Sequence, residues 1–219
     1  MQRFRTKFLL LSVVSLWMAA AATAYALAPT APKVLVHGDS LSAAYNMPIE
    51  AGWVALLSER LARQAQPWQA INSSVSGETT AGGLARLPVL LERHQPQIVV
   101  LELGANDGLR GLDPDIMQNN LATMIELSQE AGAEVLLIGI QLPPNFGQLY
   151  NAEFERVYTA LAAKYQVPLI PSLLKPVDTD RDAFQPDQLH PKADVQGRLM
   201  KPVWDALREL TATVAVAGK

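Results

Sequence analysis

The sequence of 219 residues contains no cysteine, which excludes a disulfide framework and a thiol nucleophile. Histidine is scarce: the three residues His37, His94 and His190 are scattered, without the spacing of metal ligands, so no metal site is expected. The motifs G-x-S-x-G, G-x-G-x-x-G and the P-loop are all missing. Their absence argues against an α/β-hydrolase elbow and against a nucleotide-phosphate cradle.

An excess of basic residues is also absent, since 18 Lys and Arg face 21 Asp and Glu and the formal net charge is −3. Nothing in this balance suggests a nucleic-acid partner. Long apolar runs are missing except at the N-terminus, where basic residues precede FLLLSVVSLWMAAAA and small residues follow it. This layout is typical of a secretory signal peptide.

Cleavage of this segment is expected after Ala24, with Ala28 as the alternative site, disfavoured because Pro29 would follow it. An uncleaved membrane anchor is the competing interpretation, but an anchor needs about 20 apolar residues and this core is shorter. Cleavage after Ala24 would change the net charge from −3 to −6, because residues 1–24 hold three basic and no acidic residues. We therefore expect one domain over residues 29–219, periplasmic or secreted by a bacterium, with no stable membrane span after cleavage.

Five short apolar runs without polar alternation predict parallel strands buried on both faces: 33–37, 69–73, 98–103, 134–140 and 167–170. Apolar residues at helical spacing predict four helices: one that starts near Gly52, one after Asp113 and Pro114, and two with apolar stripes over 154–165 and 195–207. Pro202 is expected to bend the last of them. The segment 79–94 is a weaker helix prediction because it contains Gly82, Gly83 and Pro88. Together the pattern predicts a three-layer α/β/α sandwich around a five-stranded parallel sheet.

Polar clusters follow the first three predicted strands and precede the last helix: G-D-S (38–40), S-G-E-T (76–79), G-A-N-D (104–107) and D-Q-L-H (187–190). Ligands of such sheets bind beyond the carboxyl ends of the strands. Ser40 is the candidate nucleophile there, and His190 is the candidate base that would remove its proton. Asp187 is close enough in sequence to orient the imidazole. The competing interpretations are a helix cap for Ser40 and a surface turn for Asp187 and His190.

Hydrolysis of an ester also needs donors for the oxyanion of its tetrahedral intermediate. The Ser40 and Gly77 backbone N–H groups and the Asn106 side chain are the candidates. The alternative for Gly77 and Asn106 is that they occupy left-handed turn positions. Asp39 and Asp107 are expected to pin turns by accepting backbone N–H groups rather than to act as the acid of a triad.

These blocks resemble the SGNH (GDSL) hydrolase superfamily: G-D-S-L-S (38–42), Gly77 in V-S-G-E-T, G-A-N-D (104–107) and D-Q-L-H-P (187–191). The segments between the blocks are similar to the bacterial periplasmic thioesterase I, lysophospholipase and arylesterase group. The resemblance implies a flavodoxin-like fold, a catalytic triad of Ser40, Asp187 and His190, and an oxyanion hole of Ser40, Gly77 and Asn106. The chain departs from the pattern at Gln188 and Leu189, where relatives often have Gly and Ile, and at Ala105, where they often have Gly.

The function expected from this resemblance is hydrolysis of carboxylic esters and thioesters of acyl chains through an acyl-enzyme, without a cofactor. Apolar residues of two loops would bind the acyl chain of a small substrate: Leu109, Leu112, Leu142, Pro143 and Phe146. Packing of these loops onto the domain is the alternative, and Gly108 and Gly111 are expected to let the first loop move. Two other functions stay open: a carbohydrate O-deacetylase or acyltransferase with the same triad, and a non-catalytic flavodoxin-like binding module.

Overall fold

The structure is a computed structural model that describes residues 31–217, and the expected signal peptide lies outside them. Within these residues five parallel strands form one sheet in the order β2-β1-β3-β4-β5. The strands are β1 (Lys33–Gly38), β2 (Gln69–Asn72), β3 (Ile98–Glu102), β4 (Glu134–Ile138) and β5 (Leu169–Ile170). All five predicted strands are confirmed, and the predicted parallel sheet with them.

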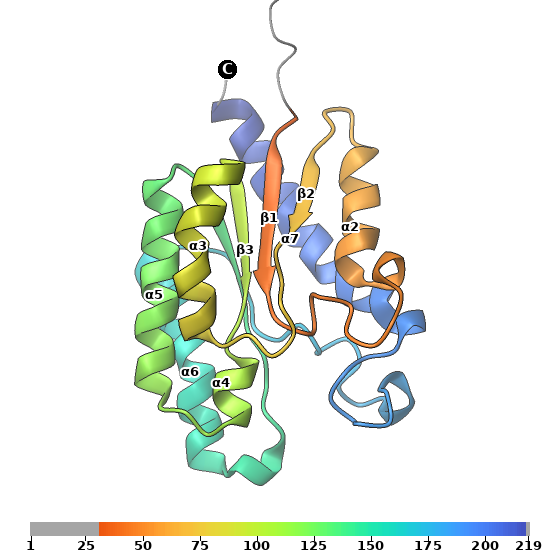
Figure 1. Cartoon of the computed structure of the whole chain (residues 1–219), viewed down its shortest axis with the longest axis vertical. Helices are drawn as coiled ribbons and strands as arrows, with labels where there is room; N and C mark the ends of the chain where they lie inside the picture. The colour runs from red at the N-terminus through yellow and green to blue at the C-terminus, as the bar shows by residue number, and fades with distance from the viewer. Residues whose placement is uncertain (1–30, 218–219) are drawn as a thin grey trace, which may run out of the picture. The chain divides into compact units, whose positions relative to one another are not determined.

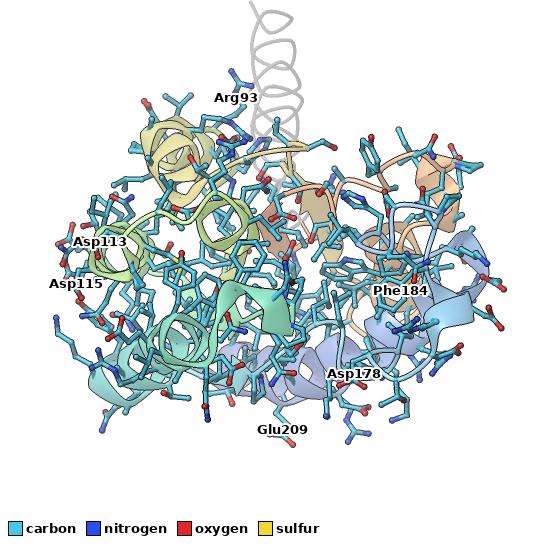
Figure 2. The ribbon with its side chains drawn as sticks, turned by 90° about the horizontal axis from the view of Figure 1, so that it is seen from below. Arg93, Asp113, Asp115, Asp178, Phe184 and Glu209 are labelled. Carbon is cyan, nitrogen blue, oxygen red and sulfur yellow. The ribbon has the colours of Figure 1, made fainter. Side chains whose placement is uncertain are left out.

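The helices pack in two groups, with the sheet between them (Figure 1). One group consists of α2 (Trp53–Ala62) and α7 (Gln196–Ala217). The other consists of α3 (Thr80–His94), α5 (Pro114–Glu130) and α6 (Gln148–Tyr165), with α5 between its two neighbours. The view from below in Figure 2 shows the same two groups, with charged residues such as Asp113, Asp115 and Glu209 on the outside. This is the predicted three-layer sandwich.

Short elements complete the chain, mostly near the carboxyl ends of the strands. They are η1 (Ile49–Ala51), α4 (Ala105–Leu109), η2 (Pro144–Phe146), η3 (Arg181–Ala183) and η4 (Ala193–Val195). Within the described part of the chain, no helix combines the length and the apolar character that crossing a membrane requires.

The strands in the middle of the sheet carry the buried apolar runs that the sequence shows. β3 is buried throughout, and β1 and β4 are buried apart from one partly or fully exposed first residue. The prediction was wrong for β2, in which Gln69 and Asn72 are exposed and Ala70 and Ile71 are half-buried. The reason is its position, because β2 is an edge strand that pairs only with β1.

The weakly predicted helix over 79–94 exists as α3, and its glycines serve packing. A Cβ at Gly83 would overlap Cδ1 of the buried Leu103, so the glycine lets α3 pack closely without a shift of that side chain. The helix begins with Thr79 as its N-cap, whose side chain accepts the N–H of Gly82. Pro88 lies inside the helix, which continues to His94.

Candidate active site

The carboxyl ends of the strands bring distant residues of the sequence to one edge of the sheet. β1 ends at Gly38, directly before Asp39 and Ser40. Ser40, Gly77, Asn106 and His190 all line one cavity of about 680 Å³ at this edge. The structure therefore unites residues that are up to 150 positions apart in the chain.

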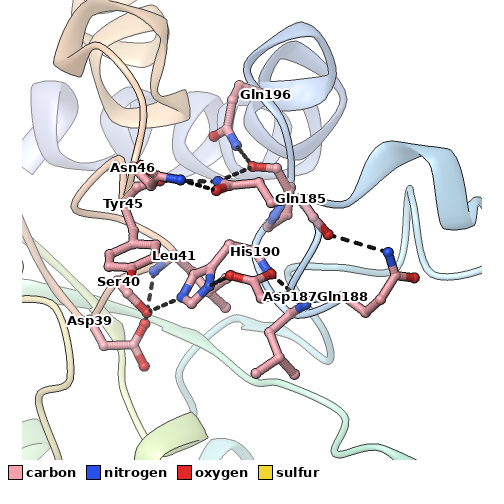
Figure 3. A network of polar contacts seen from close by, with 12 residues as sticks. Asp39, Ser40, Leu41, Tyr45, Asn46, Gln185, Asp187, Gln188, His190 and Gln196 are labelled. Carbon is pink, nitrogen blue, oxygen red and sulfur yellow. Dashed lines mark hydrogen bonds and ion pairs between the residues drawn. The ribbon is translucent and has the colours of Figure 1, made fainter.

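Ser40 lies in a turn, and its hydroxyl does not cap a helix. Residues 40–46 form turns, in which Asp39 accepts the backbone N–H of Leu41 on its side chain and that of Ala43 on its carbonyl. The Ser40 hydroxyl instead lies 2.8 Å from Nε2 of His190 (Figure 3). The helix-cap interpretation of Ser40 is therefore wrong.

The imidazole of His190 is held between this hydroxyl and a carboxylate. Nδ1 of His190 lies 2.8 Å from Oδ2 of Asp187, while Oδ1 of Asp187 accepts the backbone N–H groups of Leu189 and His190, each at 3.0 Å. Partial burial opposes ionisation of Asp187, but these hydrogen bonds outweigh it and lower the pKa of the carboxyl below its usual range. Asp187 is therefore a carboxylate at neutral pH, with one oxygen directed at the ring.

Three residues that the sequence analysis missed hold the His190 segment against the Ser40 turn. The Tyr45 ring lies against the His190 ring, with 4.3 Å between their centroids. The buried side chain of Gln185 accepts from Asn46 at 3.0 Å and donates to the Tyr45 carbonyl at 3.1 Å, and its backbone N–H donates to the His190 carbonyl at 2.8 Å (Figure 3). A buried amide that joins two distant loops has no local pattern, so the sequence offered no signal for it.

Gln188 departs from the family pattern at a position where glycine would suit the backbone. Its φ is +57°, in the left-handed region, which costs a non-glycine residue about 1–2 kcal/mol. Two hydrogen bonds compensate, because both the backbone N–H and the side-chain Nε2 of Gln188 donate to the Gln185 carbonyl, at 2.9 and 3.2 Å. Gln188 thus fastens the turn between Asp187 and His190.

The three candidate oxyanion donors border the same cavity. Gly77 has φ +80°, as the turn interpretation also required, while Asn106 lies in the short helix α4 and not in a left-handed turn. Within residues 31–217 the backbone N–H groups of Ser40 and Gly77 donate to no protein acceptor. Free N–H groups at a cavity wall can donate to a bound anion.

Asp39 and Asp107, which are next to Ser40 and Asn106 in the sequence, are buried and accept hydrogen bonds. Asp107 accepts the backbone N–H of Thr80 at 2.9 Å and its hydroxyl at 2.6 Å, so it secures the first turn of α3. Asp39 accepts Leu41 N–H at 3.0 Å and, across the edge of the sheet, Nδ2 of Asn106 at 3.1 Å. The predicted pinning role is confirmed for both, and the contact between Asp39 and Asn106 was not foreseen.

The rest of the cavity wall is mostly apolar and corrects part of the predicted acyl groove. Leu109, Leu142 and Pro143 line the cavity, as expected, together with Ile140, Leu174 and Phe184. The prediction was wrong for Leu112 and Phe146, which are not among its lining residues. Leu112 is 40% exposed, and Phe146 stacks on Tyr150 outside the cavity.

Gly108 also differs from its expected role as a loop hinge. It lies inside α4, where its N–H donates to the Gly104 carbonyl. A Cβ there would come within 2.7 Å of Leu142 and Phe154 side-chain atoms. Gly108 therefore permits close packing of α4 on the next loop, and replacing it with Ala would report on this clash rather than on loop motion.

The other two histidines take no part in the cavity. Both ring nitrogens of the buried His37 are engaged, Nε2 with the Gly83 carbonyl at 2.9 Å and Nδ1 with the Ser73 hydroxyl at 3.0 Å. His94 is the last residue of α3. Among residues 31–217, no group of three or more acidic, His or Cys side chains has an arrangement suited to a metal ion.

Burial of His37 leads to a prediction about stability. Burial lowers the pKa of His37, with Arg86 acting in the same direction, while the Gly83 carbonyl opposes it. Because the unfolded chain binds a proton more readily, stability falls as the pH drops below the unfolded pKa of about 6.5, by at most about 1.4 kcal/mol per pH unit. We expect His37→Gln to weaken this loss between pH 7 and pH 5, as measured by urea unfolding.

The matched control for this measurement is His94→Gln, because His94 is a second histidine that ends α3, whereas His37 lies in β1. It should keep the pH dependence of the wild-type protein. A His37→Gln variant that loses as much stability as wild type between pH 7 and pH 5 would contradict the assignment of this loss to His37.

A family model described as GDSL-like Lipase/Acylhydrolase family matches residues 36–197. The chain belongs to this family. Among its relatives, Esterase TesA of Pseudomonas aeruginosa is 48% identical over 180 residues, which cover 82% of this chain and 90% of that protein. A protein of Escherichia coli named for thioesterase, protease and lysophospholipase is 42% identical over 173 residues, covering 77% and 80%.

Solved structures of GDSL hydrolases share the fold. A crystal structure of TesA has a TM-score of 0.79 and covers 81% of this chain and 99% of that chain, at 48% identity. The psychrotrophic esterase EstA from Pseudoalteromonas sp., inhibited by monoethylphosphonate, has a TM-score of 0.78 at 37% identity, covering 82% and 98%. The predicted GDSL hydrolase is thereby confirmed, and a non-catalytic binding module is excluded.

Proposed function

We propose that the protein hydrolyses esters and thioesters of medium-length acyl chains, with Ser40 as nucleophile, His190 as base and Asp187 as the residue that orients His190. The observation that carries the proposal is the chain of two 2.8 Å contacts from the Ser40 hydroxyl through the imidazole to the Asp187 carboxylate. A serine hydroxyl is a weak nucleophile until a neighbouring base takes its proton. This arrangement supplies that base.

The proposed reaction has two halves. Nε2 of His190 takes the Ser40 proton while Oγ bonds to the acyl carbon, and the carbonyl oxygen becomes an oxyanion that the Ser40 and Gly77 N–H groups and the Asn106 side chain stabilise. The imidazolium then gives the proton to the leaving alcohol or thiol, and an acyl-enzyme remains. In the second half, His190 takes a proton from water, the hydroxide attacks the ester, and Ser40 recovers its proton as the acid departs.

The shape of the cavity supports an acyl chain longer than acetyl. The cavity continues from Ser40 along apolar side chains of α4 and of the loop after β4, including Leu109, Ile140 and Leu142. A pocket with an apolar wall and polar groups at one end suits a substrate whose reactive carbonyl is at the end of a hydrocarbon chain. The names of the relatives, esterase and thioesterase, agree with an ester or thioester as the group that is cleaved.

We expect Leu109→Trp to shorten the accepted chain. A Trp side chain would fill part of the cavity beside the apolar wall. We therefore expect kcat/KM for p-nitrophenyl octanoate to fall about 10- to 100-fold, a range typical of losing a methylene contact in a hydrophobic pocket. Activity on p-nitrophenyl acetate should stay within about twofold. Steady-state kinetics on the two esters measures both.

Leu112→Trp is the matched control, because Leu112 follows α4 and lies outside the cavity. It should leave the preference of octanoate over acetate unchanged. Equal losses on both esters in Leu109→Trp would contradict the assignment of this wall to the acyl chain. A wild-type enzyme that strongly prefers acetate would instead favour the deacetylase alternative.

We also propose that the domain acts in the periplasm or outside a bacterial cell after removal of residues 1–24 or 1–28. The support is the basic start, apolar run and small residues of the N-terminal sequence. The domain over 29–219 then carries all the residues assigned to catalysis.

A further inference from the structure

Asp39 has no role in the proposed reaction, although it precedes the nucleophile and is fully buried. Each of its carboxylate oxygens accepts one hydrogen bond: Oδ1 takes the backbone N–H of Leu41, and Oδ2 takes Nδ2 of Asn106. The first bond fixes the turn that carries Ser40. The second holds a side chain that is 67 positions away in sequence and is a candidate oxyanion donor.

The orientation of Asn106 matters because its carboxamide has two unlike ends. Rotation about χ2 of Asn has broad, roughly two-fold preferences, so exchange of the amide nitrogen and oxygen costs little by itself. In one orientation an N–H points into the cavity and can stabilise an oxyanion. In the other the carbonyl oxygen points there and would repel it.

We propose that Asp39 is a positioning residue that selects the first orientation of Asn106. A carboxylate presents acceptors only, so it attracts the amino end of the carboxamide and rejects its oxygen. The bond uses one N–H of Asn106 and leaves the second for the substrate. This inference rests on the proposed function, since it assigns Asp39 to the oxyanion hole of that reaction.

The environment of Asp39 suits this task. Burial raises the pKa of Asp39 to about 6, although the hydrogen bonds from Leu41 and Asn106 and the nearby His190 favour the charged form. Glu102 and Asp107 are the other acidic groups that face it. At neutral and higher pH Asp39 is thus predominantly a carboxylate, with two acceptors for its two donors.

Asp39→Asn tests the proposal, because an amide of the same shape offers one acceptor to two donors. If the oxygen of the introduced amide accepts the N–H of Leu41, its NH₂ group faces Asn106. The Asn106 carboxamide would then rotate so that its oxygen accepts from this NH₂ group. We expect kcat for p-nitrophenyl octanoate to fall about 10- to 100-fold, somewhat less than the full loss of an oxyanion donor, with KM within about threefold. A kcat within about twofold of wild type would overturn the proposal.

Asp107→Asn is the matched control, since Asp107 is equally buried and also accepts two hydrogen bonds, both from Thr80. It changes a buried carboxylate to an amide without touching Asn106, so it should lower the Tm while kcat stays within about threefold. If kcat falls equally in both variants, the cause is a general loss of stability around the site. That result would overturn the specific role of Asp39.

A double-mutant cycle separates action through Asn106 from any other action. We expect Asn106→Ala to lower kcat about 100- to 1,000-fold, and Asp39→Asn to add less than about threefold in that background. If Asp39→Asn costs the same factor with and without Asn106, the proposal fails while the proposed function stands. If Asn106→Ala itself keeps wild-type kcat, the oxyanion hole assigned under the proposed function fails too.

A measurement on the wild-type protein keeps the proposal testable if Asp39→Asn does not fold. The side-chain NH₂ signals of Asn106 can be assigned by NMR through their loss in Asn106→Ala. The proton bonded to buried Asp39 should exchange with solvent much more slowly than the side-chain amide of an exposed Asn such as Asn119. Exchange as fast as that of Asn119 would overturn the proposal.

Discussion

Replacing Ser40 with Ala should lower kcat for p-nitrophenyl octanoate by about 10⁵- to 10⁶-fold, the loss found when a triad nucleophile is removed from a serine hydrolase. In the proposed reaction this hydroxyl forms the covalent bond to the acyl carbon, and among residues 31–217 it is the hydroxyl that hydrogen-bonds to His190. The folded state should be unaffected, because the change removes one partly exposed oxygen. Steady-state kinetics, with circular dichroism for the fold, measures both.

The same reasoning predicts how this loss combines with a second one. His190→Ala should cost about as much as Ser40→Ala, and the double variant should cost no more than either, because the two groups act as one unit. The control is Ser76→Ala, a hydroxyl on the wall of the same cavity, which should retain most of the activity. Equal activity of Ser40→Ala and wild type would remove the proposed mechanism entirely.

Replacing Asp187 with Asn should lower kcat by about 10²- to 10⁴-fold, up to the loss known for the corresponding change in a buried triad. Oδ1 of Asp187 accepts two backbone N–H groups, so the Asn oxygen must stay there and its NH₂ must face Nδ1 of His190. Nδ1 then becomes an acceptor, and the ring proton moves to Nε2. In that tautomer the imidazole cannot take the Ser40 proton.

The lower end of the range applies because the Asp187 side chain is 38% exposed, and water competes for the ring. Asp194→Asn is the matched control, since Asp194 is an exposed aspartate four residues after His190 that lies outside the cavity. It should retain wild-type kcat. An Asp187→Asn variant with wild-type kcat would show that the carboxylate does not set the tautomer of His190.

Residue patterns along the chain were sufficient to predict the sheet and the layers. Strands in the middle of a parallel sheet need apolar side chains on both faces, so β3 is readable as a buried run. The same rule failed for β2, because strand order, and therefore edge position, depends on contacts between distant segments. The glycines also weakened the prediction of α3. Gly83 allows close packing against Leu103, and no local pattern in the sequence reveals that contact.

The candidate site also contains residues that the sequence could predict and others that it could not. Ser40, Asn106 and His190 each stand in a short block at the end of a predicted strand or before the last helix, so they could be identified from the sequence. The residues at the outer limits of the cavity could not be identified from the sequence. Leu109 and Leu112 look alike in the sequence, but Leu109 ends α4 and lines the cavity, whereas Leu112 follows α4 and is exposed.

Residue types and short spacings along the chain are sufficient to predict the family, the order of strands and helices, and the residues that we propose carry acyl transfer. The folded chain is needed to show that Gln185 joins the loops of Ser40 and His190 and that Asp39 accepts a hydrogen bond from Asn106. Each of these contacts pairs groups between 67 and 140 positions apart. Hydrogen bonds act over about 3 Å in space, and separation along the chain says nothing about that distance until the chain is folded.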